Sequence, residues 1–102
     1  MNIVTNFRFL KKLVTGERRQ QMMFCKVPGA MLTGYELSTD RGVTISQCLS
    51  LCTAQYGCYS VNYILSNTTC TLNNATDVGN SANIIKNLPT DYLYFTSREC
   101  DY

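Results

Sequence analysis

The clearest pattern of apolar and polar residues lies between positions 44 and 72, and its period changes once. In the first part, apolar residues recur at helical spacing and predict a short helix over 45–54. Thr44 and Gln47 fit a capping box at the start of this helix, and Gly57 is expected to end it. The residues on its apolar face are Ile45, Cys48, Leu49 and Cys52.

After Cys58 the pattern has a period of two and predicts a strand. The residues on one face of this strand are Tyr59, Val61, Tyr63 and Leu65. Residues 66–69 are polar and predict a turn, and a return strand is expected to begin at Cys70. One helix and one hairpin therefore form the unit around which the rest of the chain is organised.

Outside this unit the apolar and polar pattern is weaker, and the elements are predicted mainly from residues that favour turns. The expected elements are a strand at 31–37, a polar loop at 38–42, a long loop at 73–86 broken by a short strand at 82–85, a turn at 88–91 and a last strand at 92–95. Leu32 and Tyr35 are candidate core residues of the first of these strands.

Residues 1–24 form a basic N-terminal segment, which we separate from a domain over 25–102. The segment has a possible helical stripe surrounded by basic residues, made of Ile3, Phe7, Leu10 and Val14. A membrane-surface helix or an organelle presequence would show this pattern, but we favour a linker or an imprecise start. The segment lacks an apolar run of the length found in secretory signals.

The charge is divided unevenly between these two parts. Residues 1–24 hold five basic residues and one acidic residue, whereas residues 25–102 hold four basic and six acidic residues. The formal charge of +2 is therefore +4 in the segment and −2 in the domain. We do not expect the domain to bind nucleic acid or other polyanions through its net charge, and no stretch of the sequence is apolar enough to predict a membrane span.

The six cysteines indicate a disulfide framework that forms in an oxidising compartment. Cys48 and Cys52 are four residues apart on the predicted helix, so their Cβ atoms should be about 5–6 Å apart. A disulfide needs roughly 3.5–4.5 Å, so each should bond elsewhere. Cys58 is a natural partner for Cys52 across a short loop, and Cys70 is within reach of Cys48. Spacing alone does not decide the connectivity.

The stretches that hold these cysteines are Cys25, Cys48-Leu49-Ser50-Leu51-Cys52, Cys58-Tyr59-Ser60-Val61-Asn62-Tyr63 and Cys70-Thr71-Leu72. In order and spacing they resemble the PAN/apple domain family over about residues 25–100. The resemblance implies an α+β fold, in which one α-helix packs across a small curved antiparallel β-sheet. It also implies three nested disulfides, Cys25–Cys100, Cys48–Cys70 and Cys52–Cys58. Such modules are extracellular, bind proteins or carbohydrates, and have no catalytic activity.

Catalysis and metal binding find little support in the residues themselves. The sequence contains no histidine, so a Ser/His or Cys/His nucleophile cannot be assembled, and its acidic residues are scattered. Structural zinc normally needs two closely spaced cysteine pairs. Cys48 and Cys52 could form one pair, but Cys58 and Cys70 are too far apart to form the second. We therefore expect no enzyme activity, no metal and no cofactor.

Two asparagines are candidate N-glycosylation sites. Asn67 begins the triplet Asn67-Thr68-Thr69, and Asn74 begins Asn74-Ala75-Thr76. Asn67 is expected to be accessible because it lies at the tip of the predicted hairpin. Unmodified polar turns would show the same triplets.

The tyrosines are the remaining candidates for a binding surface. Tyr35, Tyr63 and Tyr94 alternate with apolar neighbours and are expected to be buried or half-buried. Tyr56, Tyr59 and Tyr92 could be exposed, and exposed aromatic rings suit sugar stacking or protein contacts. They could equally be ordinary rim residues of a small sheet.

These observations predict an extracellular or secreted binding module. The partner would be a carbohydrate or an extracellular protein, in an adhesion or matrix context. Two alternatives remain, a small secreted inhibitor or toxin-like scaffold and a structural module of a larger extracellular assembly.

Overall fold

The structure, a computed structural model, describes residues 6–12 and 19–96. Within these ranges it contains one α-helix, one short 3-10 helix and six strands. In chain order they are β1 (Asn6–Lys12), β2 (Arg19–Leu32), β3 (Glu36–Arg41), α1 (Ile45–Ala54), β4 (Ser60–Ile64), β5 (Thr69–Asn73), η1 (Ser81–Asn83) and β6 (Ile84–Thr96).

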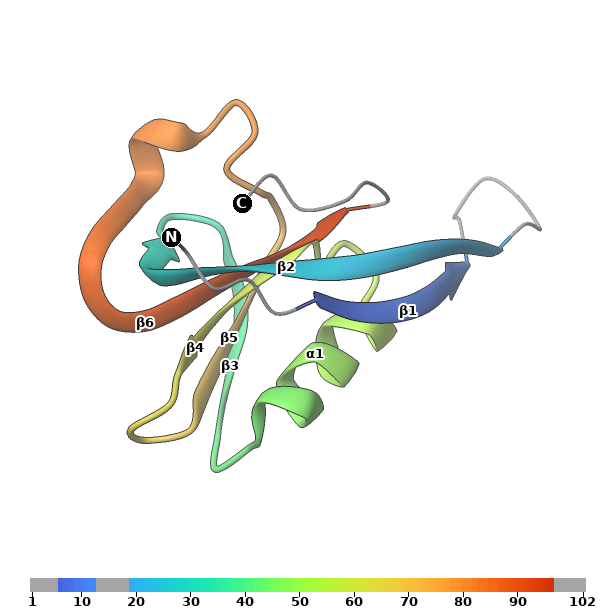
Figure 1. The fold of residues 1–102 in the computed structure, drawn as a ribbon, viewed down its shortest axis with the longest axis horizontal. Coiled ribbons are helices and arrows are strands. Elements are labelled where there is room, and N and C mark those ends of the chain that lie inside the picture. Colours follow the sequence, from blue (N-terminus) through green and yellow to red (C-terminus); the bar gives the residue numbers. More distant parts are fainter. Residues whose placement is uncertain (1–5, 13–18, 97–102) are drawn as a thin grey trace.

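The six strands form one antiparallel sheet in the order β1-β2-β6-β4-β5-β3. The long strands β2 and β6 pair with each other near the middle of this sheet. Helix α1 packs against β4 and β5 and lies on one side of the sheet (Figure 1). The predicted α+β fold, an antiparallel sheet with one helix packed across it, is confirmed.

Helix α1 begins and ends at the residues that the sequence predicts. The Thr44 hydroxyl accepts from the Gln47 N–H at 3.1 Å, and the Gln47 side-chain oxygen accepts from the Thr44 N–H at 2.8 Å. This capping box satisfies two N–H groups at the helix start. The side chains of Cys48, Leu49 and Cys52 are buried on the face that meets the sheet.

The larger core lies between α1 and the sheet. The rings of Phe24 and Phe95, from the neighbouring strands β2 and β6, stack with their centroids 3.9 Å apart. Tyr63 is buried, as expected, and its hydroxyl donates to the Val43 carbonyl at 2.7 Å. The buried members of this core are Phe24, Cys48, Leu49, Cys52, Cys58, Val61, Tyr63, Cys70, Leu72, Leu93 and Phe95.

A second, smaller core lies on the opposite face of the sheet. Successive residues of a strand point to opposite faces, and Leu93 belongs to the first core whereas Tyr92 belongs to the second. Ala30 and Leu32 of β2 complete the buried part of this cluster, and partly buried residues surround it. The surrounding residues are Val27, Tyr35, Ala75, Ile84 and Tyr94. This face of the sheet carries the candidate site.

The N-terminal residues differ from the expectation. Residues 6–12 form strand β1 and not part of a helix, and they pair with β2 from Asn6↔Cys25 to Lys12↔Arg19. A stretch this short fits both the helical and the strand period, and pairing with the next strand of the chain, β2, selects the latter. The domain boundary placed between residues 24 and 25 falls inside β2. Of the predicted stripe, Ile3 and Val14 lie outside the described residues.

The prediction of a polar loop at 38–42 is wrong, because most of these residues belong to strand β3. All six residues of β3 are exposed, so the strand has no alternation of apolar and polar residues to reveal it. It pairs with β5 at the edge of the sheet. The strand predicted at 31–37 ends at Leu32, and a bend with Gly34 at φ +90° separates it from β3.

Candidate functional site

The pairing of β2 with β6 is interrupted at one place. Pro28 lies opposite Asp91, but Ala30, two residues further along β2, lies opposite Lys86. Residues 87–90 therefore have no partner on β2, and β6 bulges away from it. The predicted turn at 88–91 overlaps this bulge, although β6 runs without a break from Ile84–Thr96.

Local interactions fix the bulge in place. Gly29 and Asn87 have left-handed backbone conformations, with φ of +72° and +62°, which glycine and asparagine adopt more readily than other residues. The Asp91 carboxylate accepts from the Gly29 N–H at 3.4 Å and forms an ion pair with Lys26 at 3.3 Å. The negative charge of Asp91 is therefore balanced within the fold.

Residues 74–83, which we call the strap, cross the same face of the sheet (orange in Figure 1). Hydrogen bonds involving Asn80 and Asn83 tie its C-terminal half to the chain after β2. The Tyr35 hydroxyl donates to the Asn80 side chain at 2.7 Å, and the Thr33 N–H donates to the Asn83 carbonyl at 3.0 Å. The region predicted as a long loop is therefore a fixed part of the fold.

Tyr92 of β6 holds the strap against the sheet through hydrogen bonds to Asp77. Its hydroxyl accepts from the Asp77 N–H at 2.9 Å and donates to the Asp77 carboxylate at 3.1 Å. Burial raises the pKa of Tyr92 well above its usual value, and the charge of Asp77 raises it further. The tyrosine therefore stays protonated and remains a hydrogen-bond donor. Beside it, the Ser60 hydroxyl donates to the Ala75 carbonyl at 2.6 Å.

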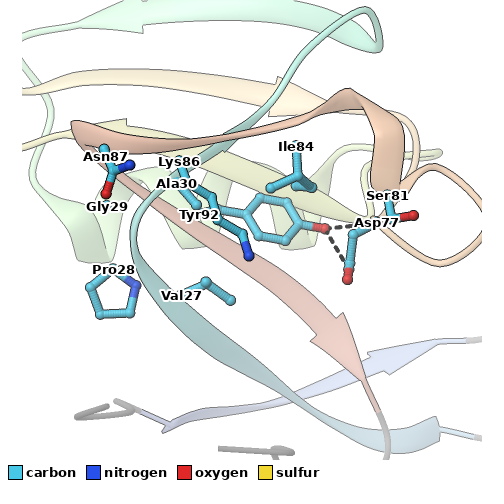
Figure 2. Close-up of a pocket in the computed structure, with 10 residues that line it drawn as sticks. All are labelled: Val27, Pro28, Gly29, Ala30, Asp77, Ser81, Ile84, Lys86, Asn87 and Tyr92. Atoms are coloured by element: carbon cyan, nitrogen blue, oxygen red, sulfur yellow. Dashed lines mark hydrogen bonds between the residues drawn. The ribbon is translucent and has the colours of Figure 1, made fainter. Parts of the chain in front are cut away.

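A pocket of about 450 Å³ lies between the strap and the bulge (Figure 2). Figure 2 shows the Tyr92 ring across its centre, with the hydroxyl directed at Asp77. Lys86, Asn87 and Ser81 add a cation, an amide and a hydroxyl to its lining. The remaining lining residues are Val27, Pro28, Gly29, Ala30 and Ile84. The pocket thus combines apolar walls with polar groups of several kinds.

The three tyrosines named as surface candidates lie in different environments. Tyr56 and Tyr59 are exposed, with 72% and 49% of their surface accessible, near the C-terminal end of α1. Tyr92 is 1% exposed, so the expectation that it could be exposed is wrong. Its side chain lies on the face of the sheet that the strap covers. The sequence pattern does not predict that residues 74–83 fold over this face. Tyr35 and Tyr94 are half-buried against the second core.

Both candidate acceptor asparagines lie on the surface. Asn67 is exposed in the turn between β4 and β5, and Asn74 is exposed at the start of the strap. The Asn74 N–H donates to the Tyr35 carbonyl, which fixes its backbone while the side chain remains accessible. Neither asparagine lines the pocket.

All five cysteines that the structure describes are disulfide-bonded. Cys48 of α1 is bonded to Cys70 of β5, and Cys52 of α1 is bonded to Cys58, which precedes β4. The first bond joins the helix to the sheet inside the larger core. Cys25 is bonded as well, but its expected partner, Cys100, lies outside the described residues.

Four polar lining residues were not among the sequence candidates: Asp77, Ser81, Lys86 and Asn87. Three of them lie in a region that was predicted as a loop, and Asn87 follows it directly. The useful signals were the dense Asn, Ser, Thr and Gly content of residues 73–86 and the Pro28-Gly29 pair, which lies opposite the bulge. Each of these signals marks irregular backbone. The sequence does not show that the two segments lie close together, whereas the pairing of β2 with β6 does.

The fold is that of a small disulfide-bonded module with a pocket on one face of its sheet. A family model described as PAN domain matches residues 22–100, so the chain belongs to the PAN domain family. PAN domains are modules that bind proteins or carbohydrates. Searches of curated proteins and of solved structures gave no match to the chain. None of the described helices has the length and apolar character needed to cross a membrane.

Proposed function

We propose that this chain is an extracellular carbohydrate-binding module and that its site is the pocket between the strap and the bulge. The proposal rests on the lining of that pocket. This lining combines apolar walls with a carboxylate, an ammonium group, an amide and a hydroxyl. A sugar is complementary to such a lining, because its hydroxyls both donate and accept hydrogen bonds while its C–H faces are apolar. The disulfides and the family support an extracellular setting, such as adhesion or matrix binding.

The dimensions of the pocket support a small ligand. Its volume of about 450 Å³ lies within the usual range for small-molecule sites, roughly 300–1,000 Å³. Hydrogen bonds fix the strap on one side, and the Asp91 contacts fix the bulge on the other. Little of the site therefore has to become ordered when a ligand binds, which lowers the entropic cost of binding.

A second candidate is a protein-binding surface at Tyr56 and Tyr59. These exposed tyrosines lie near the C-terminal end of α1, away from the pocket lining. Tyrosine is over-represented among the residues that contribute most to protein interfaces. Neither tyrosine, however, lines the pocket with its converging polar groups.

Glycan-array binding of the disulfide-bonded full chain tests the carbohydrate proposal. Lys86→Ala should weaken binding to an array glycan by about two- to fivefold, since an exposed ammonium group contributes about 0.2–1 kcal/mol. Arg41→Ala is the matched control, because Arg41 is an exposed cation at the end of β3, on the far edge of the sheet. An empty array, or equal effects of the two substitutions, would contradict the proposal. Loss of cell-surface binding in Tyr56→Ala, with an empty array, would support the second candidate.

A further inference from the structure

The pocket is lined by two charged side chains of opposite sign, Asp77 and Lys86. Another carboxylate beside the bulge, that of Asp91, is already paired with Lys26. The other lining groups are neutral. The lining as a whole therefore carries no net charge, and the positions of the two charges decide what the pocket prefers.

Asp77 is the more firmly held of these two charges. Its carboxylate accepts from the Tyr92 hydroxyl, and its own N–H donates to the same oxygen (Figure 2). An ionised carboxylate offers about four acceptor positions, so this bond leaves Asp77 able to accept hydrogen bonds from a ligand. Lys86 is exposed, and its ammonium group is a strongly hydrated charge on a flexible stem. The fixed charge at the pocket is therefore negative.

We propose that the pocket binds uncharged sugars and discriminates against acidic ones, and that Asp77 is the residue that determines this specificity. The inference rests on the proposed carbohydrate function. A sugar hydroxyl donates to the Asp77 carboxylate in a charge-assisted hydrogen bond, which is stronger than a neutral one. The carboxylate of an acidic sugar has no hydrogen to donate and is repelled by Asp77. The mobile, hydrated charge of Lys86 compensates only weakly, because solvent screens exposed charges.

Matched pairs of sugars test the inference on the full, disulfide-bonded chain. The methyl glycosides of glucose, galactose and mannose are each compared with the corresponding uronic acid, which carries a carboxylate in place of the C6 hydroxymethyl group. Affinity is measured by titration calorimetry or NMR at neutral pH and physiological salt. In the pair that binds best, the uronic acid should bind about tenfold or more weakly than the neutral glycoside.

Asp77→Asn supplies the decisive variant. It keeps the size of the side chain and an oxygen that can accept from Tyr92, but it removes the charge. The ratio of neutral to acidic affinity should fall toward one, while Asp40→Asn, the same change on exposed strand β3, should leave the ratio as it is. Circular dichroism confirms that both variants fold.

The outcomes separate the two proposals. A uronic acid that binds more tightly than its neutral partner, or an unchanged ratio in Asp77→Asn, would overturn the inference and leave the carbohydrate function in place. If neither the array nor any of the pairs shows binding, the carbohydrate function fails and the inference fails with it.

Discussion

The side-chain amide of Asn62 forms two hydrogen bonds with the backbone of Leu32. Its nitrogen donates to the Leu32 carbonyl at 2.7 Å, and its oxygen accepts from the Leu32 N–H at 2.9 Å. Both residues are buried, and strand β6 lies between their strands in the sheet order. At its bulge β6 moves away from β2, and the Asn62 amide supplies backbone-like pairing to the end of β2. This contact lies two residues beyond Ala30, which lines the pocket.

Replacing Asn62 with leucine should destabilise the fold by about 2–4 kcal/mol. The substitution leaves a buried N–H and a buried carbonyl of Leu32 without their partner, and each unsatisfied group costs about 1–3 kcal/mol. Urea denaturation measures the loss. Asn67→Leu, in the exposed turn between β4 and β5, is the control and should change stability by about 0.5 kcal/mol or less. Equal losses in the two variants would show that the Asn62 amide has no special role.

The two described disulfides should contribute unequally to stability. Cys48 and Cys70 are 22 residues apart, whereas Cys52 and Cys58 are 6 apart. Closing the longer loop restricts the unfolded chain more, by about 1 kcal/mol in the chain-entropy model. The double variant Cys48→Ala/Cys70→Ala should therefore melt at a lower temperature than Cys52→Ala/Cys58→Ala. The opposite order would show that packing around the shorter bond outweighs chain entropy.

Tyr92→Phe should loosen the strap while the larger core stays intact. The substitution removes the hydroxyl that bonds to the Asp77 N–H and carboxylate, at a cost of about 1–2 kcal/mol. Hydrogen exchange at the Asp77 amide should accelerate, while exchange at Tyr63, in the larger core, should remain slow. Similar acceleration at both positions would mean that Tyr92 supports the whole fold and not the strap alone.

The same tyrosine predicts a dependence of stability on alkaline pH. The folded state raises the pKa of Tyr92, so it binds this proton more tightly than the unfolded chain does. Its contribution is complete below the unfolded pKa of about 10 and is lost as the pH rises above that value. Urea denaturation should therefore show that the wild-type chain loses more stability than Tyr92→Phe between about pH 9 and about pH 11. Parallel losses in the two proteins would contradict this assignment.

How far the sequence predicts this structure depends on whether the contacts are local. Helix α1 was predicted to the residue, because Thr44 and Gln47 form its cap within one turn. Strand β3 was missed because its six exposed residues carry no pattern. Strand β1 was missed because its pairing with β2, and not its own period, determines its conformation.

The candidate site was harder to predict than the fold. Tyr92 follows a predicted turn, and nothing in its neighbourhood shows that residues 74–83 fold over it. Asp77 and Lys86 are nine residues apart in the chain. They line one pocket because Tyr92 holds Asp77 in the strap and because the pairing register jumps between β2 and β6 at Lys86. Contacts between residues far apart in the chain determine the site, and local composition does not predict those contacts.

Secretion of the chain from a eukaryotic cell should yield glycosylated protein. We propose Asn67 and Asn74 as acceptors, because both side chains are exposed and neither lines the pocket. Treatment with an N-glycosidase should shift the mass, and Asn67→Gln and Asn74→Gln should each remove part of that shift. A secreted chain with unmodified mass would contradict the proposal. Because the pocket is not involved, the glycans should leave sugar binding intact.

An NMR titration of the isotope-labelled chain tests whether the pocket is a carbohydrate site. The titrant is the best-binding neutral methyl glycoside of the glucose, galactose and mannose series. If the pocket binds the sugar, amide shifts concentrate at the bulge and the strap, on Gly29, Ala30, Asp77 and Asn87. Shifts that concentrate instead around Tyr56 and Tyr59, or no saturable shifts with any of the three glycosides, would contradict the proposal.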